Sequence, residues 1–197
     1  MRTRWATSVI VAGLPIVLAG CGTGTGTTPE PVRPSPTQVT SPIPPVKNPR
    51  DVAAIAQRTC ELLTPEQAKR FGLDLPPTPS DGLFGTVYCA WTSSTRDRST
   101  IRRVAISVFT NNPTLEVAYN QDRGRPSFEL TEIAGYPAVV SRSNADLPSC
   151  GVAIKPAERQ SVSITYESKE FNTNPQRSCE VAKQVAAAVV TNVPLKN

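Results

Sequence analysis

Histidine is absent from the 197 residues of this chain. Histidine supplies the base of many hydrolytic triads, many metal ligands and the usual switch near neutral pH, so its absence excludes the sites that depend on it. The G-x-S-x-G nucleophile motif, a glycine-rich phosphate loop between a strand and a helix, and spaced metal ligands are missing too. We therefore predict no catalytic residue, no cofactor and no metal site.

A strong imbalance of charge is also absent. The chain has 21 Lys and Arg residues against 16 Asp and Glu residues. Removal of a signal at residues 1–20 would take away Arg2 and Arg4, which leaves 19 against 16 and a net charge of +3. This surplus is too small and too scattered to predict binding to nucleic acid. The remaining 177 residues suffice for one domain and a tail.

The chain has no apolar run long enough to predict a spanning helix, which needs about 20 residues. The run that begins at Val9 contains Pro15 and ends at Cys21, after Arg2 and Arg4. Its last four residues, L-A-G-C, resemble the lipobox of bacterial lipoproteins, in which the cysteine sulfur takes a diacylglycerol and the chain is cut before it. We predict a signal peptide at residues 1–20 and a lipid anchor on Cys21, at the outer face of the cytoplasmic membrane. The alternative is an ordinary secretory signal followed by an unmodified cysteine.

A disordered tether is predicted for residues 21–48, because residues 22–48 hold seven prolines among many Thr and Ser residues. Proline removes backbone donors and favours extended conformations, and few side chains here can form a core. The globular domain is expected at residues 49–197.

Four cysteines remain once Cys21 is assigned to lipid, and an even number outside the cytosol predicts disulfides. Three pairings are possible. We favour Cys60 with Cys89 and Cys150 with Cys179, because each pair closes a local loop of similar length. A four-cysteine zinc site is the alternative, but it needs C-x-x-C-like pairs, and the sequence has none.

The hydrophobic pattern predicts an α+β domain, with a mostly antiparallel sheet of about six strands and helices on one or both faces. Asn-Pro pairs at residues 48, 112 and 174 and a capping box at Thr64 and Gln67 mark the helix starts. The Pro- and Gly-rich segment 75–85 is expected to be a loop. Helices are expected at about 49–58, 65–71, 113–123 and 175–193, and strands at about 86–92, 101–109, 128–132, 138–142, 150–154 and 162–166.

A few side chains are candidates for a binding site, each with a plainer alternative. Asp122-Arg123-Gly124-Arg125 is a polar cluster that suits an anionic ligand or is a solvated loop. Trp91 lies near Cys89 and is expected to pack in the core beside a disulfide, with stacking on a ligand as the alternative.

Two further candidates lie on the following strands. In Gly135-Tyr136-Pro137-Ala138 the Gly and Pro serve a backbone bend, and Tyr136 is a candidate for a pocket rim. Glu129 and Glu132 are carboxylates close in sequence, but a glycosidase pair needs a geometry that spacing alone does not supply.

The mature part resembles the actinobacterial lipoprotein family catalogued as domain of unknown function 3558. The matching segments are Cys60 to Glu66, Cys89-Ala90-Trp91, Ile133 to Ala138, Cys150, and Cys179 to Ala182 in the last helix. This resemblance covers roughly Cys60 to Pro194 and implies a single domain, both disulfides and an actinobacterial cell envelope. It implies no activity. A looser likeness links the chain to extracytoplasmic sensor domains of mycobacterial Ser/Thr kinases.

Three hypotheses about function follow. The first is a non-enzymatic, membrane-anchored envelope lipoprotein whose domain binds a small molecule, a wall component or a protein. The second is an enzyme that acts on cell-wall glycan or lipid through carboxylates, which requires a pocket with converging acidic groups. The third is a purely structural envelope protein, which requires a flat polar surface without an apolar patch.

Overall fold

The computed structural model of the protein describes residues 42–82, 86–112, 114–125, 127–142 and 148–196. The expected signal peptide, Cys21 and residues 21–41 of the expected tether lie outside the described residues. Among the helices of the described part, none has the length and apolar character needed to cross a membrane.

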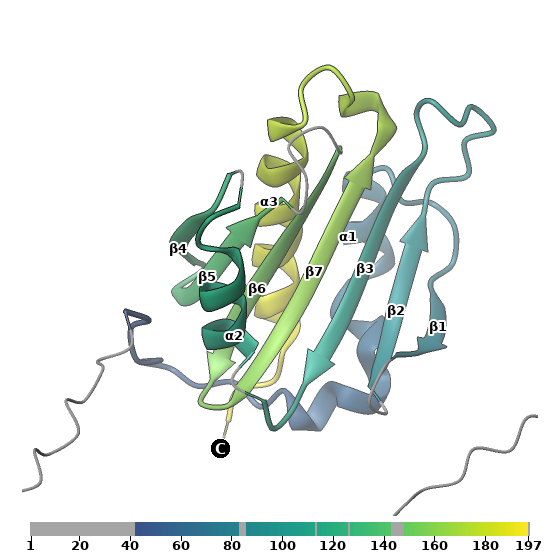
Figure 1. Ribbon diagram of the computed structural model, residues 1–197. Coiled ribbons are helices and arrows are strands. Elements are labelled where there is room, and N and C mark those ends of the chain that lie inside the picture. The colour runs from purple at the N-terminus through teal and green to yellow at the C-terminus, as the bar shows by residue number, and fades with distance from the viewer. Residues whose placement is uncertain (1–41, 83–85, 113, 126, 143–147, 197) are drawn as a thin grey trace, which may run out of the picture. The chain divides into compact units, whose positions relative to one another are not determined.

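One antiparallel sheet of seven strands organises the described residues, in the order β1-β2-β3-β7-β6-β5-β4 (Figure 1). Each strand pairs with its neighbours in antiparallel register. The fold is therefore α+β, as the sequence predicts, with one strand more than expected. The strands are β1 (Thr78–Asp81), β2 (Val87–Thr92), β3 (Arg102–Phe109), β4 (Glu129–Ile133), β5 (Tyr136–Ser141), β6 (Ser149–Ala157) and β7 (Gln160–Ser168).

Strand β1 lies in the Pro- and Gly-rich segment that we expected to be a loop, so that expectation is wrong. Pro79 pairs with Cys89 of β2. A proline is tolerated because β1 is an edge strand. On the open side of an edge strand no neighbouring strand needs a backbone N–H, so a residue without one breaks no hydrogen bond there. Composition alone misses such a strand, since its partner supplies the pairing.

Helices cover both faces of the sheet (Figure 1). The larger core lies on the face under the C-terminal helix, where Val152 and Ile154 of β6 are buried. On the other face, Ala153 belongs to a smaller cluster with Leu115. Successive side chains of a strand point to opposite faces, which places these two clusters on opposite sides. The helical elements are η1 (Ala53–Leu62), α1 (Pro65–Arg70) and α3 (Gln176–Asn192) on the first face, α2 (Thr114–Asp122) on the second, and the short η3 (Lys169–Phe171) after β7.

The helix starts agree with the sequence in part. Thr64 caps α1 and forms the predicted capping box with Gln67. The two Asn-Pro predictions at residues 48 and 174 are wrong as side-chain caps. At the start of η1 the carboxylate of Asp51, and not the side chain of Asn48, accepts hydrogen bonds from the backbone N–H groups of Ala53 and Ala54, at 3.0 and 3.2 Å. The N-cap of α3 is Pro175, which provides no side-chain cap.

Two disulfides join the helices to the sheet. Cys60 of η1 is bonded to Cys89 of β2, and Cys179 of α3 is bonded to Cys150 of β6. This is the pairing that the sequence analysis favoured among the three possibilities. Both links span 29 residues. Each fixes one helical element of the larger core onto its strand.

Packing of the domain starts before residue 49. Ile43, which the sequence analysis placed in the tether, is 7% exposed and packs with Leu115 and Val139. The backbone carbonyl of Asn48 accepts a hydrogen bond of 2.9 Å from the Tyr136 hydroxyl. The segment that leads into η1 is therefore held against the domain by apolar and polar contacts.

Candidate functional site

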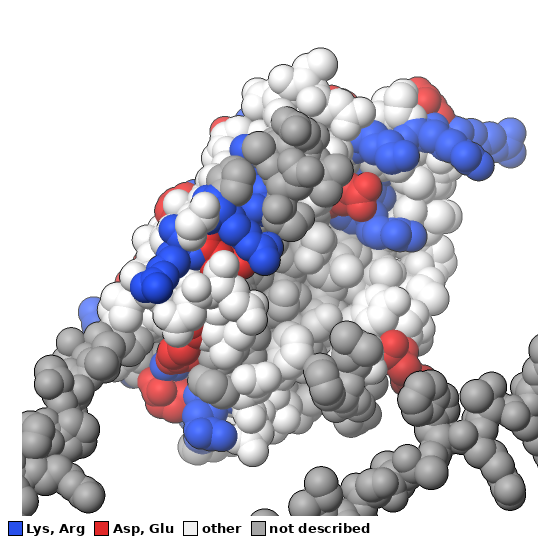
Figure 2. All heavy atoms as spheres, in the orientation of Figure 1, with Lys and Arg blue, Asp and Glu red and all other residues white. Residues whose placement is uncertain are grey.

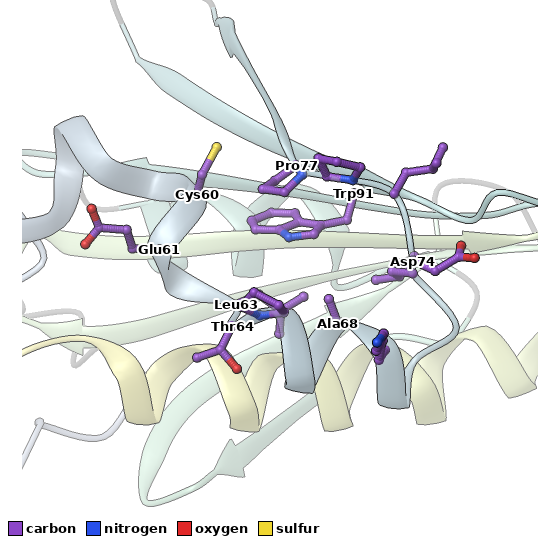
Figure 3. Close-up of a pocket in the computed structure, with 13 residues that line it drawn as sticks. Cys60, Glu61, Leu63, Thr64, Ala68, Asp74, Pro77 and Trp91 are labelled. Carbon is purple, nitrogen blue, oxygen red and sulfur yellow. The ribbon is translucent and has the colours of Figure 1, made fainter.

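An apolar pocket of about 570 Å³ lies between α1 and β2, and we call it the α1–β2 pocket (Figure 3). Its volume is within the range of about 300–1,000 Å³ that small-molecule sites occupy. The lining is contributed by the end of η1, by α1, by the segment that leads from α1 to β1, and by one residue of β2. It consists of Cys60, Glu61, Leu63, Thr64, Pro65, Ala68, Lys69, Leu73, Asp74, Leu75, Pro76, Pro77 and Trp91.

Trp91 forms the wall of the pocket on the sheet side. In β2 the side chains of Cys89 and Trp91 share the buried face, and Trp91 is only 1% exposed. Leu63 and Ala68 lie opposite the indole ring, on the side of α1 (Figure 3). Because Cys60 is bonded to Cys89, two residues from Trp91, the disulfide fixes the helical wall of the pocket against its sheet wall.

The far wall follows from the way α1 ends. Gly72 has a φ of +71°, which glycine adopts at little cost, and Leu73 then donates its N–H back to the carbonyl of Ala68. The chain returns along β2, where the N–H of Leu75 donates to the carbonyl of Thr92 at 3.1 Å. The reversal leaves Leu75 at the pocket with 43% of its surface exposed.

Charged groups lie at the margin of the pocket. The carboxylates of Glu61 and Asp74 point away from the space beside Trp91 (Figure 3). Glu61 pairs with Arg58 at 2.8 Å. The hydroxyl and the backbone N–H of Ser94 donate to the carboxylate of Asp74 and hold its pKa below the ordinary value. Both carboxylates are therefore engaged by neighbouring side chains, and they do not converge on the pocket as a catalytic pair would.

Among the side chains that the sequence suggested for ligand binding, Trp91 is the one that lines this pocket. It was expected to be a core residue beside a disulfide, and it is one, but the same side chain also borders the cavity. Sequence reasoning missed the partners of Trp91, since Leu63, Ala68 and Leu73 carry no signal beyond a hydrophobic pattern.

Tyr136 anchors the N-terminal segment. It is 5% exposed, and its hydroxyl accepts a hydrogen bond of 2.8 Å from Nε of Arg50. The guanidinium of Arg50 lies 5.8 Å from the centre of the Tyr136 ring and also donates to the carbonyls of Thr191 and Val193 at the end of α3. The neighbouring Gly135 has a φ of +86°, in the turn between β4 and β5, which is the backbone role predicted for it.

The polar cluster after α2 is tied to its surroundings. Asp122 accepts a hydrogen bond of 2.7 Å from the hydroxyl of Ser141 and pairs with Arg125 at 3.0 Å. Figure 2 shows that Lys and Arg side chains gather on this face near the end of α2 and at the loop between β2 and β3.

The two candidate carboxylates of β4 do not form a pair in one site. Glu129 pairs with Lys183 of α3, and Glu132 is exposed. Within the described residues, no group of three or more acidic or cysteine side chains is arranged to hold a metal ion.

Lys155 is a buried cation that sequence reasoning missed. Its side chain is 8% exposed, and its ammonium pairs with Glu116 and Glu158, both at 2.9 Å. Burial alone would lower the pKa of Lys155, but the hydrogen bonds to these carboxylates raise it above the ordinary value. The lysine therefore stays charged and joins β6 to α2, a structural role on the sheet face away from the pocket.

The protein is thus a small, disulfide-bonded α+β domain. Its candidate site is an apolar pocket with one helical wall and one sheet wall. The chain belongs to the family described as protein of unknown function (DUF3558), whose model matches residues 16–192. No curated protein and no solved structure matches the chain.

Proposed function

We propose that the protein is a lipid-anchored, non-enzymatic binding protein of the bacterial cell envelope, whose domain binds a small apolar molecule in the α1–β2 pocket. The single observation that carries the proposal is the pocket itself, about 570 Å³ of largely apolar space bordered by Trp91. The membership of this family supplies no reaction.

Several features of the chain support an envelope location. The L-A-G-C segment supplies the cysteine for a lipid anchor, and the Pro- and Thr-rich residues 22–41 provide a spacer. Both disulfides are in keeping with an oxidising compartment. Replacement of Cys21 by Ser is expected to release the protein from the membrane fraction. A C21S variant that stays bound to the membrane contradicts the anchor.

Binding is favoured over catalysis by the chemistry of the lining. The carboxylates of Glu61 and Asp74 face outward and are held by Arg58 and Ser94. The hydroxyl of Thr64 caps α1 by accepting from the N–H of Gln67. The lining thus offers apolar contact and no paired acid and base.

The test uses the chain 22–197. All residues of both hydrophobic clusters lie between Ile43 and Val193, and so do the four bonded cysteines, so this chain contains the whole core. Its only tryptophan is Trp91, because the other, Trp5, precedes residue 22. Titration with the uncharged dye N-phenyl-1-naphthylamine is expected to show saturable binding of one dye per chain, with a change in Trp91 emission. A linear, non-saturating response contradicts the proposal.

Native mass spectrometry of the protein solubilised from its own membrane gives an independent test. An additional mass that is present in native conditions and lost in denaturing conditions is the expected result. The denatured mass also reports acylation of Cys21 and the loss of four hydrogens for two disulfides.

A further inference from the structure

We infer that the molecule bound in the α1–β2 pocket is uncharged and largely apolar, and that it carries a carbonyl-type oxygen that accepts a hydrogen bond from the indole N–H of Trp91. This inference rests on the proposed function and specifies its ligand. It is carried by the unpartnered polar group of Trp91 in an otherwise apolar lining.

The indole N–H is the central observation. Trp91 is 1% exposed, and within the described residues no hydrogen bond joins its indole N–H to a protein acceptor. The nitrogen edge of the ring faces the space between the indole and the side chains of Leu63 and Ala68 (Figure 3). A molecule that fills this space covers the N–H, and a tryptophan N–H that is buried without an acceptor is costly. A ligand that fills this space can supply that acceptor.

The nearby protein oxygens are already engaged. The hydroxyl of Thr64 accepts from Gln67, and the carboxylate of Asp74 accepts from Ser94 and points away. A bound water needs about two to four polar partners, and the indole offers a single donor among apolar side chains. The site therefore suits an oxygen that belongs to a larger apolar molecule.

The same surroundings disfavour a charged ligand group beside Trp91. Burial of an ion without a paired counter-charge is expensive, whereas a neutral carbonyl needs only one donor. Lys69 is the one cation of the lining, but its side chain is exposed at the margin, with Asp74 and Glu61 also at the margin. The ligand oxygen that accepts from the indole N–H of Trp91 therefore belongs to a ketone, ester or amide rather than to a carboxylate.

Three probes of matched shape test the inference. In 2-acetylnaphthalene, 2-isopropenylnaphthalene and 2-naphthoate the same ring carries a carbonyl, an apolar isostere of it, or a carboxylate. For the chain 22–197 we expect the ketone to bind about threefold or more tightly than the isopropenyl compound, because a neutral hydrogen bond contributes a factor of this order. The naphthoate is expected to bind most weakly.

Trp91→Phe is the decisive variant, because it keeps an aromatic ring and removes the donor. In this variant the order is expected to reverse, with the isopropenyl compound binding more tightly, since the ketone oxygen is then buried without a partner. Arg70→Ala, at an exposed residue of α1 outside the lining, serves as the control and is expected to leave the ratio between the two neutral probes unchanged.

A second measurement needs no substitution. The chain 22–197 has a single indole, so its ¹H–¹⁵N spectrum contains one indole N–H signal. The ketone is expected to move this proton downfield and the isopropenyl compound to leave it near its free position.

The outcomes separate the inference from the proposed function. Equal binding of the two neutral probes, or an unchanged ratio in W91F, overturns the inference while the pocket remains a binding site. Tightest binding of the naphthoate, lost in K69A, shows that the ligand is an anion held at the margin. Absence of binding by all three probes contradicts the proposed function itself.

Discussion

Removal of the Cys60–Cys89 disulfide is predicted to weaken both the fold and the pocket, whereas removal of the Cys150–Cys179 disulfide weakens the fold alone. Both links span 29 residues, so loop entropy predicts nearly the same loss for each, about 3.6 kcal/mol in the free energy of unfolding. The two loops do not overlap in sequence, so the losses are expected to add. The chain thus contains a control matched in loop length.

The difference lies in what each disulfide holds. Cys60 lines the pocket, and η1 has a non-helical residue, Arg58, just before it. Besides the disulfide, Thr59 ties this part of η1 to β2 through a hydrogen bond of 3.2 Å to the carbonyl of Val87. The α3 helix, in contrast, buries Ala182 and Val185 fully on the sheet, so it keeps its place without the link at Cys179.

The assay uses the chain 22–197 with C60A/C89A or C150A/C179A. Denaturant unfolding followed by Trp91 emission is expected to give similar losses for both double variants. Titration with N-phenyl-1-naphthylamine is expected to show a dissociation constant raised about tenfold or more for C60A/C89A, which corresponds to about 1.4 kcal/mol, and within about twofold of the unsubstituted chain for C150A/C179A. Equal effects of the two variants on dye binding refute the reasoning that the Cys60–Cys89 link holds the wall of the pocket.

Three further predictions concern the polar contacts of the domain. Arg50→Ala loses the hydrogen bonds to Tyr136 and to the end of α3, and is expected to lower the free energy of unfolding by about 1–3 kcal/mol. Asp74→Asn removes a group whose pKa is lowered in the fold by Ser94, so its stabilisation is present above the ordinary pKa of 3.8 and lost as pH falls through the lower folded value. Unfolding curves of D74N and the unsubstituted chain should therefore differ at pH 6, and the difference should shrink as the pH falls below 3.8. Lys155→Met leaves two partly exposed carboxylates without their cation and is expected to lower the free energy of unfolding by about 1–3 kcal/mol, measured by denaturant unfolding.

Much of the fold was predictable because local patterns carry it. The alternation in β2 and β3 identified both strands, and the apolar stripe that includes Cys179, Ala182 and Val189 identified the last helix, where all three are buried. The capping box at Thr64 also acted locally. In each case the residues that decide the structure are neighbours in sequence.

The parts that were missed depend on distant partners. Strand β1 forms because it pairs with β2, and the proline-rich sequence of β1 does not predict this pairing. The pocket arises where α1 faces β2, so Trp91 looked like an ordinary core residue until Leu63 and Ala68 were placed opposite it. Likewise, the carboxylate of Asp51 rather than the side chain of Asn48 accepts the hydrogen bonds at the start of η1, and the carbonyl of Asn48 is bound by the distant Tyr136.

The most direct test of the central claim is dye binding to two phenylalanine variants of the chain 22–197. Ala68 lies on the helical wall opposite Trp91, and Ala90 precedes Trp91 in β2 with its side chain on the other face of the sheet. Ala68→Phe is expected to fill the pocket and abolish saturable binding of N-phenyl-1-naphthylamine, whereas Ala90→Phe should bind the dye as the unsubstituted chain does. Unchanged binding by A68F, with the variant folded, would contradict the assignment of the α1–β2 pocket as the ligand site.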